Sequence, residues 1–333
     1  MPGGVVRPRL LPKTHAGQPG LAGMPVTIPA GLLAQRVLGE DWGRWLDRLP
    51  RLAAGLLDDW RLRPTGPSLH GFCSLVLPVV DVDGTAGALK VGFDGDDESL
   101  HEGLALQHWG GRGAVRLQRA DPRRRALLLD WLPGPDLGDS WDVEACEVVG
   151  ELYGRLHIPA MPQLVEVSSY VERWLRELEE LGRDLPVPRR YVEQALSLGP
   201  DLIAYDGPTV VVHGDLHYAN VMADDAGEWR AIDPKPMAGD PHYEPAPMLW
   251  NRMDELSGPS AVGSVRDGLR RRFHAIIDAA GLDEARARDW VVVRMVLNAG
   301  WAVQDARRAG RGLSADEQDW ITGCIAITKA VQD

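Results

Sequence analysis

The segment between Val210 and Asp233 restricts the fold of this chain more than any other. It begins with three consecutive valines, a run typical of a buried strand, and continues as His-Gly-Asp-Leu-His-Tyr-Ala-Asn. Asp215 therefore lies in the loop after the strand, and Asn220 follows five positions later. A second short strand, 229–232, then leads to Asp233. The pattern predicts two strands whose ends present two carboxylates and one amide.

These residue types match what phosphoryl transfer from ATP requires. One carboxylate has to orient an acceptor hydroxyl and take its proton, while an amide and a second carboxylate supply oxygen ligands to Mg²⁺. The spacing His-x-Asp-x-x-x-x-Asn, with a further Asp beyond it, matches a kinase catalytic loop, although Gly214 stands where protein kinases have Arg. Each residue alone is compatible with a turn cap or a solvated strand end. Together, Asp215, Asn220 and Asp233 predict a kinase-like site.

A lysine in an apolar strand supports this interpretation. The chain has only four lysines, and Lys90 lies inside the run Ala-Leu-Lys-Val at 88–91, where an unpaired ammonium group is costly. Its predicted partners are the phosphates of ATP and a carboxylate on the next helix, with Glu102 as the first candidate and Glu98 as the rival. The alternative is a lysine that extends to solvent from an edge strand.

Two further segments are candidates for nucleotide contacts. The stretch 68–74 predicts a turn whose backbone N–H groups, around Gly71 and Ser74, cover phosphates. It contains neither a GxGxxG nor a Walker A pattern, so the chain is not a P-loop enzyme. The stretch 129–132, containing Asp130 and Leu132, precedes Pro133 and predicts an interlobe hinge that binds adenine. An ordinary strand end fits the second stretch equally well.

Hydrophobic periodicity divides the chain at about residue 133. Before that point, helical spacing over 29–60 predicts two helices separated at Pro50, and four β-rich runs predict an antiparallel sheet with one helix. After it, helical spacing predominates. The expected fold class is α+β, with an N-terminal lobe at 24–132 and a larger, mainly helical lobe at 133–333. Residues 1–23, rich in Pro and Gly, are expected to form a disordered tail, and Met24 is an alternative translation start.

Charge and composition exclude several classes of protein. The 36 basic and 48 acidic residues give a net charge of −12, which argues against a nucleic-acid binder. No apolar run approaches the ~20 residues of a membrane span, so no membrane partner is expected. The three cysteines are far apart in the sequence, which indicates neither a disulfide framework nor a zinc site and fits the reducing cytoplasm.

The motifs resemble those of the aminoglycoside phosphotransferases, and more narrowly the branch of streptomycin 6-kinases and hydroxyurea phosphotransferases. The resemblance rests on segments 88–91, 213–221, 231–236 and 239–241, and extends from about Ile28 to beyond Trp301. The phosphate loop has fewer glycines than the family pattern. His213-Gly214 replaces the His-Trp of some streptomycin kinases, and Glu244 stands where the pattern usually has Asp.

This resemblance implies a bilobal kinase-like fold with catalysis between the lobes. It further implies MgATP as the phosphate donor and a hydroxyl of a cationic aminoglycoside, typically streptomycin at position 6, as the acceptor, an activity associated with antibiotic resistance. By the same resemblance, Asp215 is the catalytic base, Asn220 and Asp233 hold magnesium, and Lys90 holds the nucleotide phosphates.

The acidic balance favours a cationic aminocyclitol as the partner. The candidate carboxylates for binding it are Glu244, Asp254, Glu255 and Asp305; Glu244 is also a candidate for bracing the catalytic loop. An ordinary acidic surface explains the net charge equally well. The alternatives are a kinase of hydroxyurea or a sugar, and a catalytically silent nucleotide-binding regulator. A protein kinase is disfavoured because the chain lacks an Ala-Pro-Glu element after Asp233.

Overall fold

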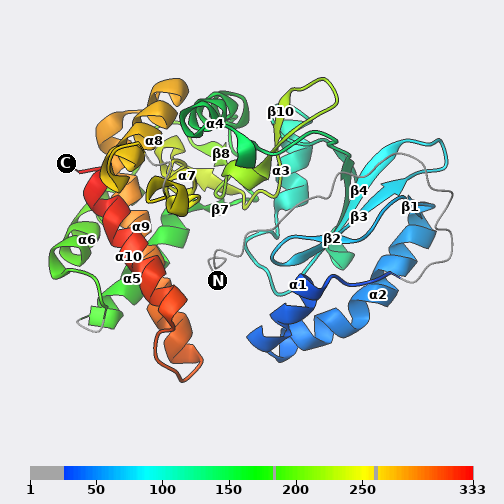
Figure 1. Cartoon of the computed structure of the whole chain (residues 1–333), viewed down its shortest axis with the longest axis horizontal. Helices are drawn as coiled ribbons and strands as arrows, with labels where there is room; N and C mark the ends of the chain where they lie inside the picture. The colour runs from blue at the N-terminus through cyan, green and yellow to red at the C-terminus, as the bar shows by residue number, and fades with distance from the viewer. Residues whose placement is uncertain (1–25, 183–184, 259–261, 333) are drawn as a thin grey trace. The chain divides into compact units, whose positions relative to one another are not determined.

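The chain forms two units (Figure 1) in a computed structural model that describes residues 26–332 except 183–184 and 259–261. One unit contains the described residues up to Gly134 together with Ala223–Ile232. The other contains Pro135–Met222 and the residues from Asp233 onward. The tail expected at 1–23 and the alternative start at Met24 lie outside the described residues.

The first unit begins with α1 (Ala30–Leu33), the 3₁₀ helix η1 (Ala34–Leu38) and α2 (Glu40–Trp60). The prediction of a break at Pro50 is wrong, because α2 continues through this proline. The break falls instead at Gly39, whose φ of 153° suits glycine. A proline removes one helical hydrogen bond, but α2 buries apolar side chains on both sides of it, and this packing maintains the helix.

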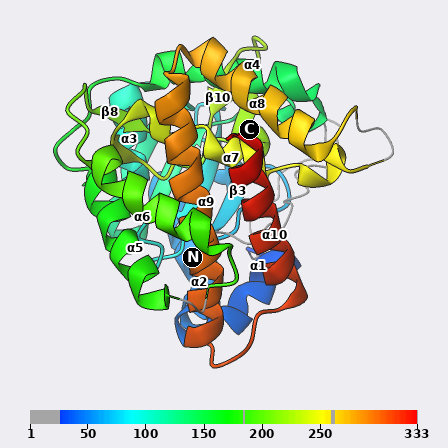
Figure 2. The same ribbon diagram turned by 90° about the vertical axis from the view of Figure 1, so that its left-hand side faces the viewer.

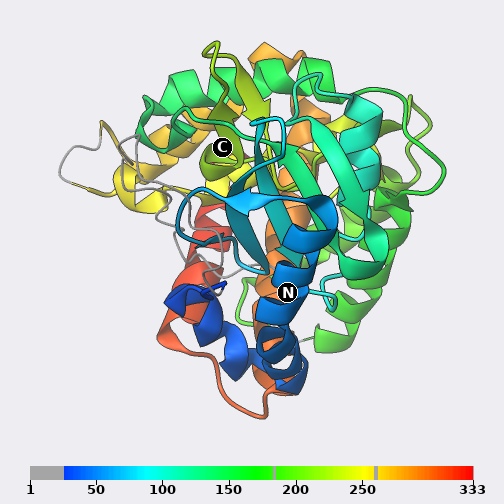
Figure 3. The same ribbon diagram turned by 90° about the vertical axis from the view of Figure 1, so that its right-hand side faces the viewer.

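An antiparallel sheet of six strands forms the rest of the first unit, with the order β1-β3-β4-β6-β5 and β2 paired to β3. The strands are β1 (Arg63–Pro64), β2 (Leu69–His70), β3 (Ser74–Val80), β4 (Ala86–Gly92), β5 (Leu117–Asp121) and β6 (Ala126–Asp130). The helix α2 packs on this sheet through a shared apolar core, and Figure 3 shows it in blue across the cyan strands. The helix α3 (Glu102–Trp109) ends at Gly110, whose φ is 57°.

Helices dominate the second unit. They are α4 (Asp142–Leu156), α5 (Val167–Leu181), α6 (Arg189–Ile203), α7 (Ala246–Trp250), α8 (Val265–Ala280), α9 (Glu284–Arg308) and α10 (Ala315–Ala330). Figure 2 shows α9 between the pair α5 and α6 on one side and α10 on the other, as their contacts also show. Ser264 and Ser314 begin α8 and α10 with capping boxes. Among the described residues, none of the helices combines the length and hydrophobicity needed to cross a bilayer.

A small sheet in the second unit carries the segment with which the sequence analysis began. Its strands are β7 (Val165–Glu166), β11 (Met237–Gly239) and β8 (Val210–Val212), with β11 in the middle. β11 runs antiparallel to β8 and parallel to β7. The hairpin of β9 (Val221–Ala223) and β10 (Trp229–Ala231) follows the loop after β8. The chain therefore leaves the small sheet at β8 and returns to it at β11.

Candidate active site

The loop after β8 carries Asp215 and lies against the segment that carries Asp233. Gly214 has a φ of 81°, and a Cβ atom at this position would lie 2.4 Å from the carbonyl oxygen of Lys235. The N–H of Lys235 donates to the carbonyl oxygen of His213 at 2.9 Å. Only glycine fits where the two segments approach so closely, which explains the absence of the arginine found in protein kinases. The fold thus brings the segments of Asp215 and Asp233 together.

Asn220 is held in place by the residue it is predicted to assist. Its Nδ2 atom donates to the backbone carbonyl of Asp215 at 2.8 Å, and the side chain is buried. This bond leaves the Oδ1 atom of the amide as the group that could bind a metal. Asp233 has a left-handed φ of 56°, a conformation that is uncommon outside glycine but that aspartate adopts more readily than most residues.

The donor set at this position fits Mg²⁺. An amide oxygen from Asn220 and a carboxylate from Asp233 are the one or two hard oxygen ligands that proteins usually supply to this ion, with phosphate and water completing the octahedron. In the described part of the chain, no group of three or more His, Cys, Asp or Glu side chains could hold a metal by itself. Asn220 and Asp233 therefore remain the residues predicted to hold the ion.

Glu244 braces the loop that carries Asp215 from inside the second unit. Its side chain is completely buried, and its carboxylate accepts hydrogen bonds from the backbone N–H groups of His213 and, at 3.1 Å, Gly214. His157 Nε2 lies 3.6 Å from Oε1. Burial alone would raise the pKa of Glu244, but His157 and the loop N–H outweigh it, so the pKa lies below its usual value. A carboxylate in this position offers no surface to an acceptor.

Arg294 of α9 supports the same loop and was missed by the sequence analysis. Its Nη2 atom donates to the carbonyl of Gly214 at 3.0 Å, and Nη1 donates to the carbonyl of Tyr243 at 2.7 Å. The guanidinium also lies 3.9 Å from the centroid of the Tyr243 ring. The signal that could have revealed it is a single arginine inside the apolar run 291–297, because a buried charge needs specific partners.

Tyr218 ties the loop to α4 and α8, another contact that the sequence did not reveal. Its hydroxyl donates to Asp142 Oδ1 at 2.5 Å, and Arg272 Nε donates to Asp142 Oδ2 at 2.8 Å. The guanidinium groups of Arg252 and Arg272 lie 4.4 and 5.7 Å from the centroid of the tyrosine ring. The segment between Asp215 and Asn220 is therefore fixed at its middle as well as at both ends.

In the first unit, Lys90 of β4 and Glu102 of α3 form a buried ion pair. The Nζ atom lies 2.6 Å from Oε1 and 2.7 Å from Oε2, and the two residues are 7% and 4% exposed. Lys90 lies in an inner strand, opposite Val76 on β3 and Leu127 on β6. It is therefore not a lysine that extends from the sheet edge.

The remaining nucleotide candidates of the first unit lie at strand ends. The N–H of Gly71 donates to the carbonyl of Ser74 at 3.0 Å and closes the turn between β2 and β3, with Ser74 buried. Asp130 ends β6, and its carboxylate accepts from Arg116 Nε at 2.8 Å. Leu132 is also buried. The side chain of Asp130 is thus engaged within the sheet, which leaves main-chain groups at 131–132 as the candidates for binding a base.

The other predicted acceptor carboxylates lie on two elements. Asp254 and Glu255 belong to the 3₁₀ helix η7 (Met253–Leu256) and are exposed, and Glu255 Oε1 accepts from Arg252 Nε at 2.8 Å. Asp305 lies on α9 and is half-buried, and this burial raises its pKa.

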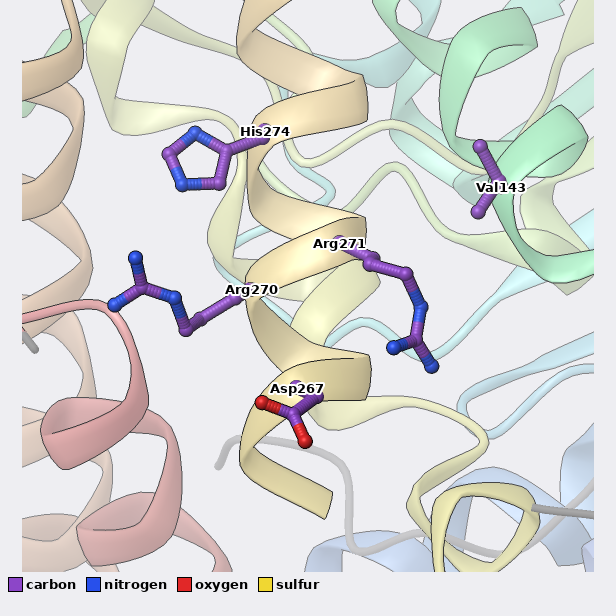
Figure 4. A pocket seen from close by; sticks show the side chains of 5 residues that line it. All are labelled: Val143, Asp267, Arg270, Arg271 and His274. Carbon is purple, nitrogen blue, oxygen red and sulfur yellow. The ribbon is translucent and has the colours of Figure 1, made fainter. Parts of the chain in front are cut away.

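A surface cavity of about 580 Å³ lies elsewhere in the second unit, on α8. It is lined by Val143, Asp267, Arg270, Arg271 and His274, none of which was a predicted site residue. Figure 4 shows Arg270 and His274 projecting to one side of α8 and Arg271 to the other, toward Val143. Its basic lining does not suit a cationic acceptor.

Comparison with known sequences identifies the family. A sequence profile of the aminoglycoside/hydroxyurea antibiotic resistance kinases matches residues 59–306. The chain is 36% identical over 291 residues to a streptomycin 6-kinase of Streptomyces glaucescens, with 85% of this chain and 93% of the relative covered. It is also 36% identical over 297 residues to a hydroxyurea phosphotransferase of Kitasatospora aureofaciens, with 86% and 83% covered.

The fold agrees with this assignment. A choline/ethanolamine kinase family protein from Mesorhizobium loti superposes with a TM-score of 0.55 at 15% sequence identity, covering 81% of this chain and 89% of that one. The predicted α+β kinase-like fold and the predicted family are both confirmed. The chain belongs to the aminoglycoside/hydroxyurea antibiotic resistance kinases, and it is a phosphotransferase that acts on a hydroxyl group.

Proposed function

We propose that this enzyme transfers the γ-phosphate of MgATP to a hydroxyl of a cationic aminoglycoside, with the 6-hydroxyl of streptomycin as the acceptor. The observation that carries the proposal is the backbone hydrogen bond from Lys235 to His213, which aligns the Asp233 segment with the Asp215 loop. A base and two metal ligands on adjacent segments form the arrangement that in-line phosphoryl transfer requires.

In this mechanism Asp215 orients the acceptor hydroxyl and takes its proton during attack on the γ-phosphate. Asn220 and Asp233 would hold Mg²⁺, which when bound neutralises charge on the phosphates. Lys90, kept charged and oriented by Glu102, binds the phosphates from the first unit. The proposal requires that Lys90 and Asp233 reach the same nucleotide. As predicted from the sequence, the nucleotide is also bound by the backbone around Gly71, Ser74, Asp130 and Leu132.

Two observations support a cationic acceptor. One relative of 36% identity is named a streptomycin 6-kinase, and the net charge of −12 attracts a polycation. The second relative acts, by its name, on hydroxyurea, so that uncharged compound is the rival acceptor. A catalytically silent regulator is disfavoured because Lys90, Asp215, Asn220 and Asp233 are all present.

The proposed role of Asp215 is tested by Asp215→Asn, which keeps the shape of the side chain and removes the base. We expect kcat to fall by about 10²- to 10⁴-fold, with the Kd for ATP changed by less than about threefold because Asp215 does not bind the nucleotide. Calorimetry gives the Kd, and a coupled assay gives kcat. Asp225→Asn, at an exposed position, is the matched control. Wild-type turnover in Asp215→Asn would remove the assignment.

The acceptor is identified by offering streptomycin, hydroxyurea and simple sugars with MgATP, and by mapping the phosphorylated position by NMR. Phosphorylation of streptomycin at the 6-hydroxyl is the expected result. Phosphorylation of hydroxyurea alone would replace the proposed acceptor with the rival. No transfer to any compound, together with retained ATP binding, would favour the silent regulator.

A further inference from the structure

Three aromatic side chains form one cluster, here called the Trp cluster: Tyr170 and Trp174 of α5, and Trp301 of α9. The ring centroids of Trp174 and Trp301 are 5.0 Å apart, and Tyr170 lies 6.2 and 6.4 Å from them. All three contacts are edge-to-face, and all three residues are half-buried. The cluster is therefore partly at the surface, where a ligand can contact aromatic faces.

Polar atoms in and beside the Trp cluster are buried without hydrogen bonds. In the described part of the chain, the Nε1 atoms of Trp174 and Trp301 and the Oδ1 atom of Asn298 have no hydrogen-bond partner. Asn298 as a whole is only 2% exposed. Buried polar groups are nearly always satisfied, and an N–H directed at a ring is a weak substitute. Two donors and one acceptor thus lack partners at one place on α5 and α9.

The position of these groups on α9 connects them to the catalytic loop. Arg294, Asn298, Trp301 and Asp305 are spaced by four, three and four residues, so they form one stripe along the helix. Arg294 holds the carbonyl of Gly214. At ~1.5 Å of rise per residue, Trp301 lies ~10 Å along α9 from this contact. The Trp cluster therefore lies on the same side of α9 as the arginine that contacts the loop of Asp215.

The chemistry of this stripe favours a cation that also carries hydroxyl groups. The guanidinium of the exposed Arg173 already lies 5.5 Å from the centroid of Tyr170 and 5.1 Å from that of Trp174, and aromatic faces attract such a group. Asp305, one turn beyond Trp301, is a partly buried carboxylate whose Oδ1 atom lies 3.4 Å from Nη1 of the exposed Arg308, so a bound cation would compete with that arginine for it.

We propose that the Trp cluster, Asn298 and Asp305 form the subsite that receives the guanidino- or amino-bearing part of the acceptor. This inference rests on the proposed function. The cation displaces the Arg173 side chain from the rings and pairs with Asp305. Hydroxyl groups of the ligand accept from the two indole N–H groups and donate to Asn298 Oδ1. A small uncharged acceptor cannot make these contacts, so the subsite selects for a polyhydroxylated cation.

Binding of streptomycin in the presence of ADP and Mg²⁺ tests the subsite by calorimetry. We expect Trp301→Leu and Asp305→Asn to raise the Kd at least tenfold, and Arg173→Gln to lower it severalfold because a competing cation is removed. The matched controls, Trp141→Leu and Asp319→Asn at exposed positions, should change it less than twofold. A wild-type Kd in both Trp301→Leu and Asp305→Asn would overturn the proposal.

A measurement on the wild-type protein avoids any dependence on the folding of variants. The chain contains twelve tryptophans, whose indole N–H signals can be assigned by single Trp→Phe substitutions in a ¹⁵N-labelled sample. Streptomycin should shift the signals of Trp174 and Trp301 downfield as they acquire acceptors, and leave that of Trp320 on α10 in place. Unmoved signals for both residues with streptomycin bound would contradict the proposal.

The two proposals fail in distinguishable ways. If streptomycin is phosphorylated but neither the indole signals nor the variants respond, the proposed function stands and the subsite is wrong. If streptomycin is not phosphorylated but still shifts the signals of Trp174 and Trp301 downfield, the subsite stands and the proposed acceptor is wrong. If streptomycin is not phosphorylated and does not shift these signals, both proposals are wrong.

Discussion

Single residues in this enzyme stabilise the catalytic loop through buried charge. The carboxylate of Glu244 is compensated by two backbone N–H groups and by His157, and its pKa in the folded protein lies below the ordinary value of 4.5. A group with a lowered folded pKa binds fewer protons when folded than when unfolded. It therefore stabilises the fold above its unfolded pKa, and this contribution is lost as the pH falls toward the folded value.

The substitution Glu244→Gln tests this linkage. Because the amide keeps the shape but loses the charge, we expect unfolding by urea at pH 7 to require about 1–3 kcal/mol less. The decline of stability on acidification from about pH 5 downward should also be less steep than in wild type. Glu147→Gln, at an exposed position on α4, should leave both quantities unchanged. If the stability of Glu244→Gln decreased as steeply on acidification as that of wild type, a group other than Glu244 would be responsible for the acid sensitivity.

At the scale of elements, the close approach of two loop segments depends on one missing Cβ atom. Both Gly214 and Gly227 have φ near 80°, but a Cβ at Gly214 would collide with the carbonyl of Lys235, whereas nothing lies within 4 Å of one at Gly227. Alanine substitutions at these two glycines therefore separate the loss of stability caused by the backbone conformation from the loss caused by the collision.

We expect Gly227→Ala to destabilise the protein by about 1 kcal/mol, because alanine is strained at positive φ. Gly214→Ala should cost at least about 2 kcal/mol more, since overpacking displaces backbone, and should reduce kcat as Asp215 moves away from Asp233. Urea unfolding and steady-state kinetics measure the two effects. Equal stability losses in the two variants would show that the loops separate easily.

The ion pair between β4 and α3 gives a second prediction at this scale. Glu102→Gln leaves the buried ammonium of Lys90 with a neutral partner, and we expect a loss of about 3–5 kcal/mol in the stability of the first unit. The KM for ATP should rise as well. Asp97→Asn, exposed in the loop before α3, serves as the control. A loss of less than about 1 kcal/mol would mean that Lys90 has compensating partners.

The elements also show where sequence reasoning succeeds and where it fails. The antiparallel sheet and the predominance of helices after it were predicted correctly because hydrophobic periodicity is a local signal. The break in α2 was misplaced because packing against the sheet outweighed the local preference of Pro50. Asp215, Asn220 and Asp233 were proposed from their spacing in the sequence. Arg294 and the contact of Tyr218 with Asp142 could not be proposed in this way, because they join segments that only the tertiary fold brings together.

At the scale of the whole molecule, the net charge of −12 attracts a cationic acceptor over long distances. Added salt screens this attraction, and the Debye length falls from ~20 Å at ~0.02 M to ~4 Å at ~0.5 M. We expect kcat/KM for streptomycin to fall about tenfold over this range, while kcat changes little. With hydroxyurea, which is uncharged, kcat/KM should stay constant. A salt-independent value for streptomycin would show that the charge plays no part in its capture.

The first unit is built from two separate segments of the chain, and this affects its folding during synthesis. The first unit consists of the residues up to Gly134 and of Ala223–Ile232, where Ala231 pairs with the backbone at Ala114 and Val115. A ribosome that has just released Gly134 has therefore not yet synthesised the last piece of that unit. The six-stranded sheet can pair by then, but the backbone at Ala114 and Val115 lacks its partner until almost a hundred further residues have emerged, and it would be exposed to chaperones and proteases during that interval.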